Sequence, residues 1–335
     1  MTTLHIQYYG FDFPPHSLIS ILKSLNFQEP TCVILFDPFN GKELPYEYIR
    51  ELDKKNLYVI ITTQEGASDQ WFDRLIPRLI DHCGVAQSNI ILRSSCLYNP
   101  NNNIKQIHTF VDNCVEFLKS LENKDLTVGP DTTHHFVCLN RMHRWQRYNL
   151  VTNLLDQKLD KFGIISYLTL PTNNADPGRF PMQIDWDVNE SIKHQRHLTV
   201  DHPGITGALF NVITESSYEN TDESHYLPML SEKSFKCFAL HQIPIWLTPY
   251  HSVTCFREIG FDVFDDIVDH SYDLEPDPVH RIELVTKQIE KICKLTNLND
   301  IRQQLKPRFL KNIETLKSYT NYQTELPQWK KIFFG

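Results

Sequence analysis

The pattern of apolar and polar positions predicts alternating strands and helices over the first 130 residues. Short apolar runs rich in β-branched residues, typical of buried strands, are each followed by a segment whose apolar residues recur every three to four positions. The strand-like runs begin at residues 4, 31, 57 and 89, and the last helix-like segment covers 104–124. Strands that alternate with helices form parallel, helix-covered sheets. We therefore expect an α/β domain over residues 1–130.

The pattern breaks at Gly129 and Pro130 and then restarts, which places a domain boundary there. We expect a second α/β domain over residues 131–298. Its predicted strands and helices are the strands 135–140, 208–215, 243–247 and 261–264 and the helices 144–159, 231–242 and 281–295. The polar, proline-containing stretch 171–203 is predicted to be a long loop. Residues 299–335 follow as a helical tail that we expect to pack across both domains.

Composition narrows the class of protein. With 335 residues, of which 41% are hydrophobic, the chain has enough apolar residues for two ordinary cores. It contains neither an apolar run of about 18 residues nor a leader pattern at its start, so we expect a soluble, cytoplasmic protein without a membrane span. The eight cysteines form no CxxC pair, and we expect reduced thiols. The net charge of −8 disfavours nucleic acid as the default partner.

Carboxylates follow three strands of the first domain. In a parallel sheet, ligands bind beyond the carboxyl ends of the strands. Asp12, Asp37 and Glu65 each come shortly after a predicted strand of residues 1–130. Because a carboxylate can accept the proton of a reacting hydroxyl, these three residues are candidate catalytic bases.

Basic residues gather where the strand 135–140 meets the following helix. Asn140 ends the strand, and Arg141 and Arg144 come next, at a spacing that puts both on one face if the helix begins there. The free N–H groups at a helix start, together with guanidinium groups, favour a phosphate ligand. A solvated basic face is the alternative.

A second group of polar residues begins at Glu215, the last residue of a predicted strand. Across a polar loop, Ser231 is a suitable helix N-cap, and Glu232, Lys233 and Lys236 lie in the first turns of that helix. A carboxylate here can accept hydrogen bonds from a ribose diol, and a lysine can offset phosphate charge. Ordinary helix capping with surface lysines explains the same residues.

The order of these pieces resembles the donor-binding domain of GT-B glycosyltransferases, in particular the α-1,3-fucosyltransferases and glycosyltransferase-like proteins of large phages. The matching segments are FVCLNRMHRWQR, KFGIISY, FNVITES, LSEKSFKCFAL, IPIWL and FREIGFDVFDDIVDHSYD. The resemblance covers about 160 residues and includes no motif of the first 130. The acceptor-side histidine and glutamate motif of true fucosyltransferases is not evident in this sequence.

The resemblance implies two Rossmann-like domains that face a central cleft. It implies that Arg144 contacts the donor diphosphate, Glu232 the ribose, and Lys233 or Lys236 the phosphates, with Glu215 beside the sugar. The implied activity is transfer of a sugar from a nucleotide-diphosphate sugar, based on UDP or GDP, to an acceptor hydroxyl. The acceptor can be a glycan, a protein or a modified DNA base.

The sequence leaves two alternatives to this activity, and it gives little support for a metal. One alternative is a DNA-modifying glycosyltransferase that acts on hydroxymethylated bases. The other is a non-catalytic nucleotide-binding or assembly protein with the same fold. Asp185 and Asp187 match the Asp-x-Asp metal motif of the other glycosyltransferase architecture, but they lie in the predicted loop. We therefore expect a metal-independent enzyme without a cofactor.

Overall fold

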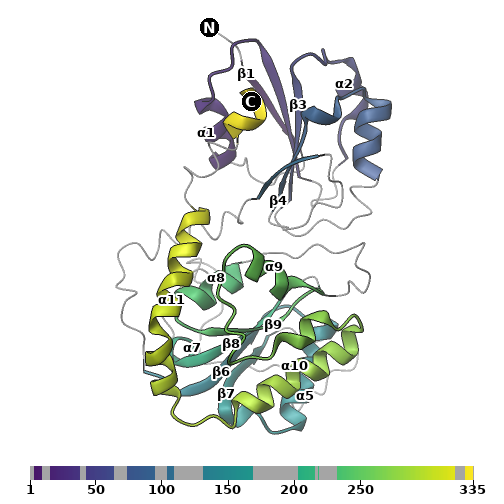
Figure 1. Cartoon of the computed structure of the whole chain (residues 1–335). Helices are drawn as coiled ribbons and strands as arrows, with labels where there is room; N and C mark the ends of the chain where they lie inside the picture. The colour runs from purple at the N-terminus through teal and green to yellow at the C-terminus, as the bar shows by residue number, and fades with distance from the viewer. Residues whose placement is uncertain are drawn as a thin grey trace. The chain divides into compact units, whose positions relative to one another are not determined.

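The structure is a computed structural model whose chain divides into two compact units (Figure 1). Unit 1 comprises Met1–Asp112, Ser224–Leu230 and Tyr319–Gly335, and unit 2 comprises Asn113–Glu223 and Ser231–Ser318. The residues that the structure describes are 4–9, 16–37, 43–63, 74–94, 104–108, 131–168, 203–215, 218, 232–320 and 329–334.

Unit 1 contains a parallel five-stranded sheet whose strands lie in chain order. The strands are β1 (Leu4–Tyr9), β2 (Thr31–Phe36), β3 (Leu57–Thr63), β4 (Ile90–Ser94) and β5 (Lys105–His108). The prediction of a helix beginning at residue 104 was wrong, because Lys105–His108 pairs in parallel with Ile91–Ser94. The local apolar spacing fits a helix, but pairing with the free edge of β4 prevails over it.

Helices cover both faces of this sheet. α1 (His16–Ser24) packs with Val33 and Leu35 of β2, whereas α2 (Tyr46–Glu51) packs with Ile34 and Phe36. Successive residues of a strand point to opposite faces. The connections β1–α1–β2 and β2–α2–β3 therefore lie on opposite faces of the sheet. Both lead to the next strand in the same direction across the sheet, so the two crossovers have opposite handedness. One of them is left-handed, which is rare in parallel sheets, and the two connections diverge at the ends of β1 and β2.

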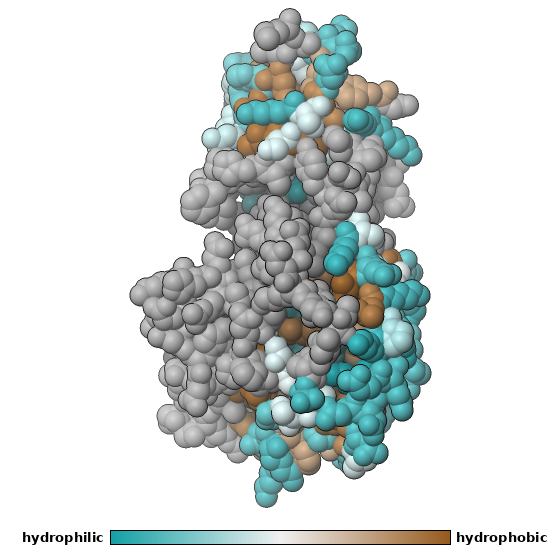
Figure 2. Space-filling model, turned by 90° about the vertical axis from the view of Figure 1, so that its left-hand side faces the viewer, coloured by the Kyte–Doolittle hydropathy of each residue, from teal (hydrophilic) through white to brown (hydrophobic). Residues whose placement is uncertain are grey.

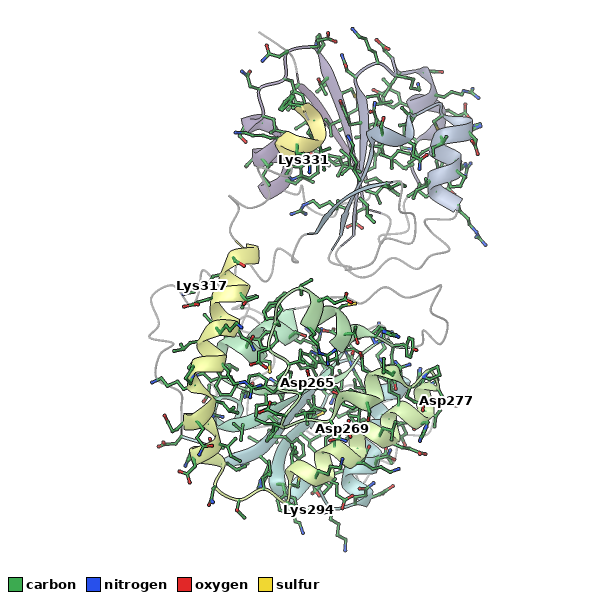
Figure 3. The ribbon with its side chains drawn as sticks, in the orientation of Figure 1. Asp265, Asp269, Asp277, Lys294, Lys317 and Lys331 are labelled. Atoms are coloured by element: carbon green, nitrogen blue, oxygen red, sulfur yellow. The ribbon has the colours of Figure 1, made fainter. Side chains whose placement is uncertain are left out.

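The C-terminal segment adds a short helix to unit 1. Residues 329–334 are helical, and Trp329 is fully buried among side chains of α1, β2, β3 and β4. The ring of Phe333 contacts Phe27 and Tyr58 edge to face, at centroid distances of 5.1 and 4.6 Å. Lys105 donates a 3.0 Å hydrogen bond from Nζ to the carbonyl of Ile332. Figure 3 marks Lys331 on this helix. The segment therefore completes the α1 side of the unit 1 core.

Unit 2 contains a parallel four-stranded sheet in the order β7-β6-β8-β9. The strands are β6 (His134–Asn140), β7 (Gly163–Tyr167), β8 (Ala208–Thr214) and β9 (Ile243–Leu247). Figure 1 shows helices on both faces of this sheet. One face carries α5 (Trp145–Asp156) and α10 (Pro278–Ile292), and the other carries α7 (Pro203–Thr206), α8 (Glu232–Ala239) and α11 (Leu298–Thr320). The predicted α/β class is thus confirmed for both units.

Two local features of unit 2 have clear physical causes. Gly163 begins β7 at a close approach, since a Cβ there would lie 2.6 Å from the carbonyl oxygen of Phe136. Asp277 precedes α10 (Figure 3) and caps it by accepting the N–H groups of Val279 and His280 at 2.8 and 3.0 Å. A negative charge at a helix N-terminus is stabilising, and these bonds lower the pKa of Asp277.

The predicted strand 261–264 was wrong. These residues lie outside any strand, and Phe264 has a φ of 62°. Phe261, Val263 and Phe264 are all buried, because they pack beneath α9 (Ser252–Glu258), α8 and α11. The short apolar run is therefore an irregular core segment, which periodicity does not distinguish from a strand.

The described residues also show the character of the surface, the length of the helices and the state of six cysteines. Figure 2 shows mainly hydrophilic side chains on the described surface of unit 2, with smaller hydrophobic areas between them. Among the described helices, none is both long and apolar enough to span a bilayer. The six cysteines within the described ranges are free thiols.

Candidate functional site

The strand order of unit 2 reverses between β6 and β8. From β6 the chain enters α5 on one face, whereas from β8 it continues towards α8 on the other. Connections that leave adjacent strands in opposite directions open a crevice at the carboxyl edge of a parallel sheet, where ligands bind. Asn140 and Glu215 mark the two sides of this switch point, and both were predicted site residues.

Asn140 ties the two strand ends together. Its side chain is 1% exposed, and its Oδ1 accepts a 2.7 Å hydrogen bond from the hydroxyl of Thr214. Its backbone N–H donates to the hydroxyl of Ser166 on β7 at 3.2 Å. The amide group predicted to bind the donor is therefore committed to protein groups, and Asn140 contributes to the framework of the site.

Residues 141–144 form a loop before α5. The helix begins at Trp145, so Arg141 and Arg144 do not occupy one helical face as the sequence predicted. Both arginines are exposed. His143 lies 2.5 Å from the hydroxyl of Tyr167 at the end of β7. Burial raises the pKa of Tyr167 to about 12, and its bond with the backbone of Arg144 opposes the shift. The loop thus presents two guanidinium groups on a fixed backbone.

Two buried side chains of α5 reach the end of β8. Gln146 donates from Nε2 to the carbonyl of Glu215 at 3.1 Å. Arg147 donates from its two terminal nitrogens to the carbonyls of Met142 and Thr214 at 3.1 and 2.9 Å. Burial lowers the pKa of the Arg147 guanidinium; the Glu215 carboxylate opposes this shift, and the charge of Arg144 adds to it. In the sequence, Arg147 is one more basic residue after Arg141 and Arg144, and the spacing alone does not show which of the three is buried.

Glu215 is a fully buried carboxylate at the end of β8. Its Oε2 lies 3.1 Å from Nζ of Lys233, whose side chain is 32% exposed. Lys236, on the same helix α8, is half-buried. Glu232 is the first residue of α8, but its side chain and the whole of Ser231 lie outside the described residues. The predicted proximity of the Glu215 strand end and the start of the following helix therefore holds for Lys233.

Among the candidate bases of unit 1, the structure describes Asp37. It directly follows β2, is 7% exposed, and donates its backbone N–H to the carbonyl of Tyr9 at 3.0 Å. It lies where the β1 and β2 connections diverge to opposite faces. Asp12 and Glu65 lie outside the described residues, as do Asp185 and Asp187. Within the described ranges, no three His, Cys, Asp or Glu side chains are grouped as a metal site requires.

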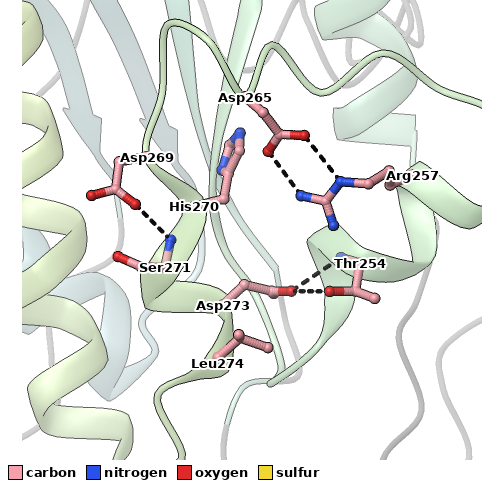
Figure 4. Close-up of a pocket in the computed structure, with 8 residues that line it drawn as sticks. All are labelled: Thr254, Arg257, Asp265, Asp269, His270, Ser271, Asp273 and Leu274. Atoms are coloured by element: carbon pink, nitrogen blue, oxygen red, sulfur yellow. Dashed lines mark hydrogen bonds and ion pairs between the residues drawn. The ribbon is translucent and has the colours of Figure 1, made fainter.

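A separate open pocket of about 410 Å³ lies beside α9 in unit 2 (Figure 4). Arg257 and Asp265 form a bidentate ion pair at its rim, with bonds of 3.0 and 2.8 Å. Asp273 accepts the backbone N–H groups of Val253 and Thr254, both at 3.0 Å, and so caps α9. The carboxylates of this pocket are thus engaged in holding α9 and the segment 265–274. Sequence reasoning did not single out these residues.

Comparison of the chain with profiles of known protein families, with curated proteins and with solved structures found no match. The chemistry of the switch point therefore rests on its own residues. Arg147 and Lys233 carry two positive charges around one buried carboxylate, Glu215, and Arg141 and Arg144 lie exposed in the adjoining loop. This edge of the sheet suits an anion with several oxygen acceptors.

Proposed function

We propose that unit 2 binds the diphosphate of a nucleotide sugar at the switch point between β6 and β8. The main support is the charge arrangement: Arg147 and Lys233 flank Glu215, and Arg144 is close enough to Arg147 to lower its pKa by like-charge repulsion. A bound anion relieves that repulsion, and guanidinium forks match phosphate oxygens.

We infer further that the chain is a metal-independent glycosyltransferase of the GT-B type. The support for this step is the resemblance of the unit 2 segments to the GT-B donor domain, together with two parallel sheets that are each covered by helices. Arg141, Arg144, Lys233 and Lys236 stabilise the departing nucleoside diphosphate. A carboxylate of unit 1 removes the proton of the acceptor hydroxyl. Asp12, Asp37 and Glu65 are the candidates for this role, and of these the structure describes Asp37, directly after β2.

Calorimetric titration of the full chain with UDP and GDP tests the binding site. We expect one of them to bind, and Arg144→Ala and Glu232→Ala to abolish measurable binding without a change in melting temperature. Arg50→Ala is the matched control, since its side chain is 54% exposed on α2 of unit 1. Removing that charge leaves affinity unchanged. Equal affinity in the wild type and both site variants would contradict the assignment.

Release of UDP or GDP from a panel of nucleotide sugars, measured in the presence of EDTA, tests the reaction. Release that depends on an added acceptor supports glycosyl transfer, and Asp37→Asn then lowers the rate while donor affinity stays unchanged. Binding without any release favours a nucleotide-binding protein. Salt-sensitive retention of duplex DNA, together with transfer to hydroxymethylated bases, identifies the DNA-modifying activity instead.

A further inference from the structure

Main-chain pairing between β6 and β8 stops before either strand ends. The last register pair is Val137 with Asn211, whereas the strands continue for three more residues, to Asn140 and Thr214. On its other side, β8 stays paired with β9 as far as Thr214. The carbonyls at the β6-facing end of β8 therefore need other donors. Side chains of α5 provide them.

Arg147 donates one bond to the end of β8 and a second bond to the neighbouring loop, both from one rigid group. Arg147 is 5% exposed. Its two terminal nitrogens donate hydrogen bonds to carbonyls of two different segments. One carbonyl belongs to Met142, in the loop that carries Arg141 and Arg144, and the other belongs to Thr214, next to Glu215. Because the fork is planar, it fixes the direction and the separation of both carbonyls. The loop and the end of β8 are thus held in one geometry.

We propose that Arg147 is a positioning residue for the phosphate site. This proposal rests on the function proposed above. It holds the 141–144 loop at a set distance from the Glu215–Lys233 pair, so that both sides meet the same diphosphate. Its burial excludes it from direct contact with the ligand. The role requires the fork and not only the charge, because the ammonium of a lysine has no fixed plane with which to orient two carbonyls.

The distinguishing measurement is the preference for a diphosphate over the corresponding nucleoside. We compare the dissociation constants of UDP and uridine, and of GDP and guanosine, for the wild type, Arg147→Lys and Arg147→Met. Because neither variant holds the loop and the end of β8 in one geometry, we expect diphosphate affinity to fall at least about tenfold in both, which corresponds to about 1.4 kcal/mol. Nucleoside affinity changes by less than about twofold. Binding is measured below the melting temperature of each variant.

Arg302→Met is the matched control. Arg302 is a buried arginine of α11, and it donates to the carbonyls of Thr206 and Ala208 at the opposite end of β8. Since β8 spans Ala208–Thr214 and a strand rises about 3.3 Å per residue, the two arginines cap ends roughly 20 Å apart. Arg302→Met therefore lowers the melting temperature without changing the diphosphate preference.

The outcomes separate the two proposals. If the wild type binds neither UDP nor GDP, the function proposed above fails. If it binds one of them and both Arg147 variants keep the wild-type preference, the positioning role alone fails. If Arg147→Lys behaves as the wild type while Arg147→Met loses the preference, the residue acts through its charge, which also overturns the positioning role. If Arg302→Met loses the diphosphate preference to the same extent, the effect is a general structural one, and the positioning role is overturned as well.

Discussion

Replacing Trp329 by alanine should destabilise unit 1 selectively. Trp329 lies late in the chain, yet it is fully buried against residues of α1, β2, β3 and β4. Its ring also stacks on Phe333 at a centroid distance of 5.8 Å. The substitution removes a large side chain from one face of the core, and the neighbouring residues of α1 and of the sheet are held by regular structure and cannot readily collapse into the space.

The size of the effect follows from two independent estimates. A buried tryptophan removes about 150–250 Å² from water, which at about 25 cal/mol per Å² corresponds to roughly 4–6 kcal/mol. Measured losses for large aromatic residues replaced by alanine are about 3–5 kcal/mol. We therefore expect a loss of about 4 kcal/mol. Because domains are stable by only about 5–15 kcal/mol, this is a large share of the stability of unit 1.

Hydrogen exchange read by mass spectrometry resolves this loss by unit. In Trp329→Ala, we expect faster exchange in peptides that cover β2, β3 and β4, and unchanged exchange in peptides that cover β6, β8 and β9. Phe334→Ala is the control, because Phe334 is 50% exposed and its loss should lower protection only slightly. Equal acceleration in both units, or wild-type protection of β2 to β4, would refute the reasoning.

Two further predictions concern unit 2. Gly163→Ala should lower the free energy of unfolding by about 1–3 kcal/mol in urea denaturation, because its Cβ would meet Phe136 at 2.6 Å; no loss would mean that β7 shifts freely. The pKa of His270 lies below the ordinary 6.5 because burial disfavours its charged form. Its folded pKa is depressed, so its stabilising contribution is complete above pH 6.5 and is lost as pH falls through the folded pKa. An NMR titration that gave His270 a pKa above 6.5 would contradict this.

The hydrogen bonds around His270 explain why its neutral form is favoured in the folded protein. Its Nε2 lies 2.8 Å from the carbonyl of Val263, which can only accept, so Nε2 carries the proton. Its Nδ1 then accepts from the hydroxyl of Tyr272 at 2.8 Å. That hydroxyl in turn accepts the backbone N–H of Trp246 at 3.1 Å. A second proton on His270 would face the Tyr272 hydroxyl proton and break this chain of bonds.

The sequence predicted most strands of both sheets because their apolar runs are continuous and are bounded by polar segments. It failed at β5, where four residues become a strand only because β4 offers a free edge. It failed also at 261–264, whose apolar residues are buried on all sides in an irregular segment. Both failures arise from tertiary contacts that no local pattern encodes.

The candidate site was predictable to the extent that it follows from strand ends. Glu215 and Asp37 were found because polar residues that directly follow parallel strands lie at one edge of the sheet. The separate tasks of Arg144 and Arg147 were not predictable, because the difference depends on where α5 begins. A shift of a few residues in that start exchanges an exposed guanidinium for a buried one, and helix boundaries are the least certain part of any reading of sequence.

The position of Trp329 also bears on the order of events during synthesis. The strands of unit 1 precede those of unit 2 in the chain, but residues 329–334 of the unit 1 core follow the segments that make up unit 2. Domains usually fold in the order in which they are made. Here all segments of unit 2 can be synthesised before Trp329, which belongs to the α1 side of the unit 1 core. The core of unit 1 is therefore completed only after the segments of unit 2 have been synthesised, and until then the apolar residues on its α1 side lack the side chain that covers them.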